Sequence, residues 1–117
     1  MSKYLVYGIK NCNTVKKALD FLNSKSVDYQ FHDYKKSGVS LEKLQNWAQQ
    51  IGYEKLLNKN GTTWKQIDES LKNQIIDQES TLSFLVTKTS AIKRPIVELD
   101  GKIVAIGFDA NAYLNQF

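Results

Sequence analysis

The residue of this sequence with the greatest potential for chemistry is its single cysteine, Cys12. It lies in a polar segment after a short apolar run, a setting that does not suit a buried structural cysteine, the alternative interpretation. At the junction of a strand and a helix, free backbone N–H groups and the helix dipole favour a thiolate. The sequence therefore predicts a nucleophilic Cys12. Its polar neighbours are candidate substrate-binding residues: Lys10, Asn11, Asn13 and Thr14.

Arg94 is the second candidate catalytic residue and the only arginine in the chain. It lies between Lys93 and Pro95, the only proline, and both neighbours are candidate binding residues. A guanidinium offers two parallel donors to a carboxylate or oxyanion and stabilises a nearby thiolate. The alternative is an ordinary surface charge. The choice between them depends on whether the fold brings Arg94 close to Cys12.

Composition excludes several other classes of protein. One cysteine and one histidine exclude an intramolecular disulfide and make a metal site of Cys and His ligands improbable. The net charge of +4 comes from scattered lysines and is typical of a solvated surface, so no specific nucleic-acid partner is expected. No apolar run approaches the roughly 18 residues of a membrane span, and no signal peptide is recognised after Met1. We therefore expect a cytoplasmic protein.

Two other residue types are better explained by structure than by chemistry. His32 falls on the polar side of a predicted strand and is expected to be a surface or strand-edge histidine. Trp47 and Trp64 are expected to pack inside the helical region.

The elements that must position Cys12 form a predicted β-α-β unit. An apolar run over 4–7 ends at Gly8 and predicts a buried strand. Apolar residues then recur at helical spacing from Val15 to Leu22, with Asn13 or Thr14 as the expected N-cap. Alternation over 27–32 predicts a half-buried second strand.

The middle of the chain is predicted to be an inserted helical segment, about residues 38–80. Ser40 is the expected cap of a helix that ends before Gly52. Thr63 and Gln66 fit a capping box for a short helix. Further helical character covers 71–76 and 82–88.

The end of the chain predicts two strands and a helix. Asp100-Gly101 is a hairpin signal between apolar runs at 96–99 and 103–106, and a helix is expected from about Asp109. The order β-α-β, helices, β-β-α favours an α/β, thioredoxin-like fold in a single domain over 1–117. Pro95 opens the third strand, where this fold class places a cis-proline beside its reactive cysteine. The isomer of the Arg94-Pro95 bond stays open at this point.

Four segments together resemble the ArsC (arsenate reductase) family, in its YffB-like branch, which is related to the Spx and MgsR regulators. In order they are 7–12 (YGIKNC), 31–34 (FHDY), 56–64 (LLNKNGTTW) and 92–96 (IKRPI). The resemblance implies a thioredoxin-like fold with a helical insertion and a nucleophilic cysteine in the first loop. It also implies reduction with glutathione or glutaredoxin as the electron donor.

The chain also departs from this family's arsenate reductases. They carry a histidine where Gly8 stands, and arginines where Asn58 and Gly107 (or its neighbour) stand. Asn58 remains a candidate binding residue at the second of these arginine positions. One arginine in place of three weakens oxyanion binding. Val15 occupies the place of the second cysteine that Spx regulators often carry.

We therefore expect a monothiol oxidoreductase with no bound cofactor, whose mixed disulfide on Cys12 is resolved by glutathione or glutaredoxin. A monomer without membrane attachment is expected. The first alternative is a true arsenate reductase. The second is a non-enzymatic, Spx-like regulator that binds RNA polymerase. Two features disfavour this alternative: the chain lacks a Cys-x-x-Cys pair, and it ends at Phe117, directly after the last predicted helix.

Overall fold

The computed structural model describes residues 3–117, so Met1 and Ser2, where a signal sequence would begin, lie outside the described residues. The described chain divides into two compact units, one formed by residues up to Ser37 together with Arg94–Phe117, the other by Gly38–Lys93. No helix in the described part is both long enough and apolar enough to cross a membrane.

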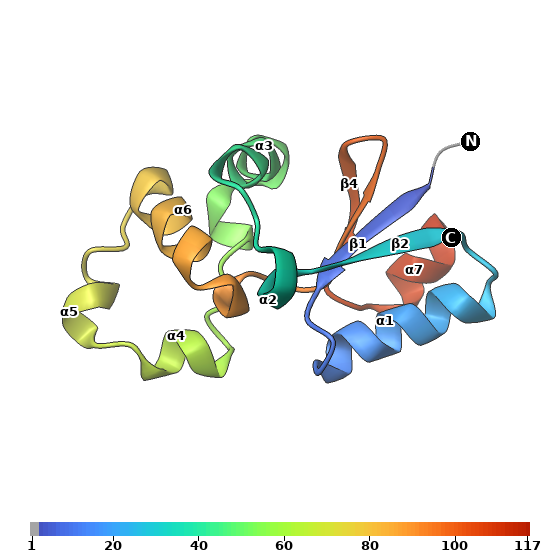
Figure 1. The fold of residues 1–117 in the computed structure, drawn as a ribbon, viewed down its shortest axis with the longest axis horizontal. Coiled ribbons are helices and arrows are strands. Elements are labelled where there is room, and N and C mark those ends of the chain that lie inside the picture. Colours follow the sequence, from blue (N-terminus) through green and yellow to red (C-terminus); the bar gives the residue numbers. More distant parts are fainter. Residues whose placement is uncertain (1–2) are drawn as a thin grey trace. The chain divides into compact units, whose positions relative to one another are not determined.

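The first unit is built on a four-stranded sheet in the order β2-β1-β3-β4 (Figure 1). Its strands are β1 (Tyr4–Gly8), β2 (Tyr29–Asp33), β3 (Ile96–Leu99) and β4 (Lys102–Ile106). β1 pairs in parallel with β2 and antiparallel with β3, and β3 and β4 form the hairpin predicted at Asp100-Gly101. This mixed sheet confirms the predicted α/β class with its thioredoxin-like order of elements.

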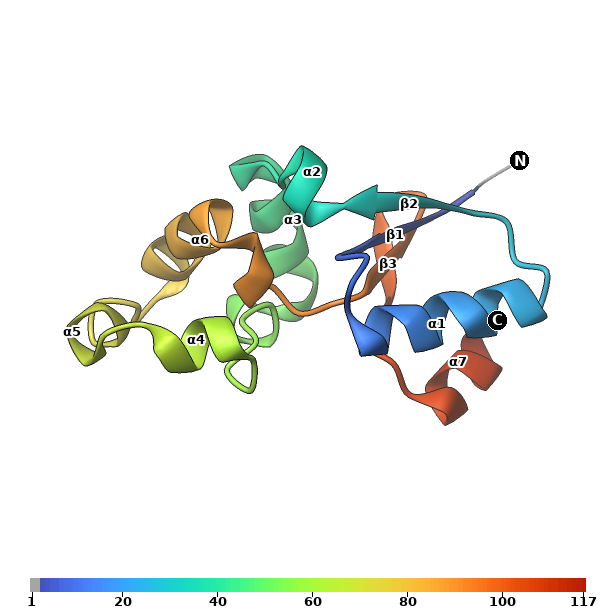
Figure 2. The ribbon, with the colours of Figure 1, turned by 60° about the horizontal axis from the view of Figure 1, so that its bottom comes forward.

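Two helices of the first unit lie on the same face of this sheet (Figure 2). They are α1 (Asn13–Ser24) and α7 (Ala110–Gln116), while the short α2 (Tyr34–Ser37) follows β2 directly. The core between helices and sheet is a cluster of fully buried side chains: Val6, Ala18, Leu22, Val97 and Tyr113. The Tyr113 hydroxyl donates a 2.7 Å hydrogen bond to the Gly107 carbonyl oxygen. This bond ties α7 to the chain just after β4.

The second unit is helical. Its elements are α3 (Leu41–Ile51), η1 (Tyr53–Lys55), α4 (Thr62–Gln66), α5 (Glu69–Lys72), α6 (Gln78–Thr87) and η2 (Thr89–Ala91). Trp47 is fully buried on α3, as expected for a packing residue. Trp64 is half-buried with its ring against Phe84, and the Nζ atoms of Lys59 and Lys72 lie 5.5 and 5.8 Å from its ring centroid.

Several predicted element ends differ from the structure. The second strand begins at Tyr29 instead of Val27. Helix α4 is preceded by Gly61 without a side-chain cap, so the capping box at Thr63 is wrong, and the Thr63 hydroxyl instead pairs with that of Ser90 at 2.7 Å. Ser40 caps α3 as predicted, accepting a hydrogen bond from the Lys43 N–H.

The last two helices of the second unit are also displaced from their predicted ranges. Helix α5 covers Glu69–Lys72 instead of 71–76, and α6 covers Gln78–Thr87 instead of 82–88. Asp77 and Ser80 form the capping box of α6. The sequence carried this start signal, because an aspartate precedes a serine by three residues. The apolar spacing alone placed the start of this helix at residue 82, four residues after its start at Gln78.

Candidate active site

Cys12 is the N-cap residue of α1, which corrects the predicted cap at Asn13 or Thr14. Its backbone is extended, with φ −112° and ψ 125°, and its carbonyl oxygen accepts the first helical hydrogen bond from the Lys16 N–H. The thiol is therefore at the end of the helix where the backbone N–H groups are free. Cys12 is half-buried, so its sulfur is both shielded and reachable.

Gly8 allows β1 to approach α1 closely just before the cysteine loop. A Cβ at this position would lie 2.9 Å from a methyl carbon of Val15, closer than side chains tolerate. The histidine expected here in the family's arsenate reductases would therefore require Val15 to move. The close packing of β1 against Val15 of α1 therefore explains the glycine at position 8.

Arg94 reaches Cys12 from the start of β3. Its side chain hydrogen-bonds to the Cys12 thiol. The Arg94-Pro95 peptide bond is cis, and the carbonyl oxygen of buried Pro95 accepts a 2.8 Å hydrogen bond from the Gly107 N–H. Cys12 and Arg94, the two residues predicted to be catalytic, thus lie together within the first unit.

The pKa of the Cys12 thiol is lowered in this environment. Burial acts first and raises the pKa, but the backbone N–H of Val15 and the hydrogen bond and charge of Arg94 outweigh it. The backbone N–H of Thr14 contributes in the same direction. Cys12 makes no side-chain capping hydrogen bond, so we attribute the effect of these N–H groups to their dipoles.

The first testable prediction concerns the pH dependence of this thiol. Because the thiolate is the reactive form, alkylation of Cys12 by iodoacetamide should reach half its maximal rate below pH about 8.5, the ordinary thiol value. Stopped-flow or quenched alkylation from pH 4 to 10 measures the midpoint. Arg94→Met is the matched control and should raise the midpoint. A wild-type midpoint at or above about 8.5 would show that Cys12 is not activated.

The other residues predicted around the cysteine fall into two groups. Lys10, Asn11, Asn13 and Thr14 are exposed in the loop and first turn beside Cys12, where a ligand could meet them. Asn58 and Lys93 belong to the second unit, where the Lys93 N–H bonds the Leu56 carbonyl oxygen at 2.7 Å. Their role in binding stays a prediction.

Asn58 has a local structural task within the second unit. Its side-chain oxygen accepts a 3.2 Å hydrogen bond from the Asn60 N–H, and its backbone N–H donates to the Ala91 carbonyl oxygen at 2.8 Å. A Cβ on Gly61 would lie 2.9 Å from the Asn58 side-chain nitrogen. The carboxamide of Asn58 therefore organises a tight turn. A short Asn or Asp side chain fills this role better than a long arginine.

The structure also places three residues in this region that the sequence reasoning missed. Tyr7 and Tyr34 are buried with their rings stacked at 6.4 Å, and the Tyr7 hydroxyl hydrogen-bonds to Glu98, which is 1% exposed. Burial and the negative charge of Glu98 raise the pKa of Tyr7 to about 12. A glutamate on an apolar strand was the available signal, because buried carboxylates are rare unless partnered.

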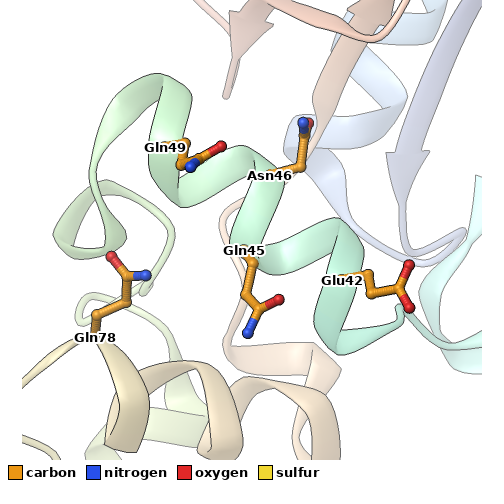
Figure 3. A pocket seen from close by; sticks show the side chains of 5 residues that line it. All are labelled: Glu42, Gln45, Asn46, Gln49 and Gln78. Carbon is orange, nitrogen blue, oxygen red and sulfur yellow. The ribbon is translucent and has the colours of Figure 1, made fainter.

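One pocket of the second unit lacks the groups of a reaction site. This pocket has a volume of about 420 Å³ and is lined by Glu42, Gln45, Asn46 and Gln49 of α3 and by Gln78 of α6. Figure 3 shows four carboxamides and one carboxylate around it, with no nucleophile or cation among them. Among residues 3–117, no group of three or more His, Cys, Asp or Glu is placed to hold a metal ion.

Comparison with known proteins shows similarity over nearly the whole chain. The model of the ArsC family matches residues 7–116. A Haemophilus influenzae protein described as uncharacterized is 44% identical over 112 residues, which are 96% of each chain. The solved structure of the YFFB protein is 38% identical with a TM-score of 0.90, covering 97% of this chain and 98% of that one. An arsenate reductase (ArsC) related protein from Brucella melitensis is also 38% identical, with a TM-score of 0.78 and coverages of 97% and 92%.

Proposed function

The chain belongs to the ArsC family, and we propose that it is a monothiol oxidoreductase that uses glutathione as its co-substrate. The observation that carries this proposal is the Cys12 thiol, held at the N-terminus of α1 with the Arg94 guanidinium hydrogen-bonded to it. This arrangement favours the thiolate, which is the form that attacks disulfides.

The proposed reaction has two thiol–disulfide exchange steps. The Cys12 thiolate attacks the glutathione sulfur of a mixed disulfide, the old S–S bond breaks, and the substrate thiolate leaves and takes up a proton from solvent. A second glutathione thiolate then attacks the Cys12 mixed disulfide, forming glutathione disulfide and restoring the Cys12 thiolate. The net reaction is that of a mixed disulfide with one reduced glutathione to give the free substrate thiol and glutathione disulfide, so one glutathione thiol is oxidised for each substrate thiol released. Because Cys12 is the only cysteine, the second thiol must come from outside the chain.

Arg94 and the loop supply the binding chemistry of this proposal. The guanidinium beside the sulfur suits a carboxylate of glutathione, and the exposed loop residues next to Cys12 offer amide and hydroxyl groups to its peptide bonds. The N-terminus of α1 stabilises negative charge on the sulfur during attack. Glutaredoxin in place of glutathione would serve as the resolving thiol by the same step. A reducing cytoplasmic compartment and a monomeric state fit this scheme.

Arsenate reduction is a second candidate, favoured by the similarity to the Brucella melitensis protein named as related to arsenate reductase. In this chain Asn58 organises a turn, and Gly107 has a positive φ of 69° that favours glycine. Arg94 would then face the oxyanion without the two further arginines of the family's arsenate reductases. We therefore rank disulfide exchange first.

Turnover with reduced glutathione tests the two functions side by side. Purified protein is given either a glutathione mixed disulfide of a small thiol or arsenate, and formation of glutathione disulfide is followed through glutathione reductase and NADPH. We expect steady turnover with the mixed disulfide that Cys12→Ser abolishes, and little turnover with arsenate. Faster turnover with arsenate would favour the second candidate. No turnover with either substrate would contradict both and favour a regulatory role.

A further inference from the structure

Three exposed lysines flank Cys12 in the chain, and we call them the lysine rim. Lys10 lies in the loop before the cysteine, and Lys16 and Lys17 follow the first turn of α1. The Lys16 N–H donates the 2.9 Å hydrogen bond to the Cys12 carbonyl oxygen, so these two residues are one helical turn apart on the same face. Because long side chains of a helix lean toward its N-terminus, Lys16 is directed over the turn that begins at Cys12. The solvent-facing surface beside the thiol is therefore positively charged.

No carboxylate of the described chain neutralises this rim. Among residues 3–117, none of the three lysine side chains forms an ion pair. Asp20, the next acidic residue along α1, is exposed and forms no ion pair with Lys16 or Lys17. Exposed, unpaired ammonium groups keep their charge available to an incoming anion.

The stability of α1 does not explain the lysines near its N-terminus. The positive end of the helix dipole favours acidic residues there and disfavours cations. Glutamates follow this rule in the first turns of α3, α5 and α6, where Glu42, Glu69 and Glu79 lie. The first turn of α1 holds no acidic residue, and lysines come directly after it. Such a departure from the local rule is typical of a surface that serves binding.

The arrangement of the rim favours an acidic polypeptide over a small anion. Lys16 and Lys17 point about 100° apart around the helix, and Lys10 lies on the other side of Cys12 in the chain. One small anion cannot contact all three, whereas an acidic segment that crosses the cysteine can. The ligand must also bring a disulfide to Cys12, which a polypeptide can carry and a nucleic acid does not.

We propose that the lysine rim selects the substrate of the exchange reaction, a glutathione mixed disulfide on an acidic polypeptide segment. This inference rests on the proposed function, in which the Cys12 thiolate attacks the glutathione sulfur and the substrate thiolate leaves. The lysines act on the leaving half: they attract it from solution and stabilise the negative charge of the departing thiolate. Arg94 remains with the glutathione half. Because the rim is exposed, salt must weaken the selection.

The test measures glutathione transfer to Cys12 from two probes, the glutathione mixed disulfides of the end-blocked peptides EECEE and QQCQQ. Quenched intact-mass spectrometry under single-turnover conditions gives the rate constants. Each is divided by that of 2-mercaptoethanol with the same probe and salt, which removes the intrinsic difference between the disulfides. We expect EECEE to be preferred about fivefold at an ionic strength of about 0.1 M, where the screening length is about 10 Å. At about 1 M, where it is about 3 Å, the preference should fall below about twofold.

Two double variants locate the source of this preference at about 0.1 M salt. Lys16→Gln with Lys17→Gln should reduce it to about twofold or less, since Gln keeps the helix and removes the charge. Lys25→Gln with Lys102→Gln is the matched control and should keep it about fivefold. Lys25 follows the 12 residues of α1, about 18 Å from the cysteine end, and Lys102 pairs with the last residue of β3, away from Arg94 before its start.

The possible results separate this inference from the proposed function. Equal normalised rates for the two probes on wild type overturn the inference and leave the proposed function standing. An equal fall in both double variants means that net charge sets the preference, which also overturns it. Transfer from neither probe contradicts the proposed function and the inference with it.

Two further results also decide the matter. Inhibition by a short oligothymidylate without any preference for EECEE assigns the rim to nucleic acid and overturns the inference. If the Lys16 and Lys17 double variant fails to fold, the salt dependence of wild type decides, and a preference that persists unchanged at about 1 M overturns the inference.

Discussion

Oxidised glutathione should convert the native protein into a single species that carries one glutathionyl group on Cys12. The thiolate form is favoured at the N-cap of α1 beside Arg94, so exchange should proceed near neutral pH without denaturant. Because the chain holds no other cysteine, the mixed disulfide cannot rearrange into an intramolecular bond and should accumulate. Added reduced glutathione should reverse it completely.

Intact-mass spectrometry after timed treatment measures this conversion. Cys12→Ser should remain unmodified, a complete loss and the largest effect expected of any substitution in the chain. Denatured wild type is the second control, since unfolding removes the helix dipole and Arg94 from the sulfur and should slow the reaction at pH 7. A native protein that stays unmodified while the denatured protein reacts would identify Cys12 as a buried structural thiol.

The order of elements in the first unit could be predicted from the sequence because each carries a strong local signal. Alternation and apolar runs marked the strands, helical spacing marked α1, and Asp100-Gly101 marked the hairpin. The short helices of the second unit were placed less well. Their ends are set by single N-cap residues such as Gly61 and Asp77. The apolar spacing in these short helices is too weak to locate those ends from the sequence.

The active site could be predicted only in part. Cys12 and Arg94 stand out in the sequence because each is the only residue of its type. The buried side chains Tyr7, Tyr34 and Glu98 could not be found in this way. They come from three elements, and their proximity follows only from the sheet register and the packing of α2. The glutamate on the apolar run 96–99 was the one available signal, but the sequence does not show which side chains it contacts.

Replacement of Arg94 by lysine should reduce the reaction of Cys12 with glutathione disulfide more than its reaction with a small neutral disulfide. Lysine keeps the positive charge near the sulfur but loses the planar pair of donors that a carboxylate can engage. A charge-assisted bidentate contact is worth on the order of 1.5–3 kcal/mol when shielded. Arg94 is only half-buried, so the lower end applies and the selective loss should be about tenfold.

Second-order rate constants for both disulfides, measured on wild type, Arg94→Lys and Arg94→Met, separate the two roles of this side chain. A loss toward glutathione disulfide alone in Arg94→Lys assigns Arg94 to recognition of the carboxylate. Equal losses toward both disulfides would mean that Arg94 acts only through the pKa of Cys12, which Arg94→Met should then raise further. Rates that stay at the wild-type value in both variants would return Arg94 to the status of a surface charge, despite its hydrogen bond to the thiol.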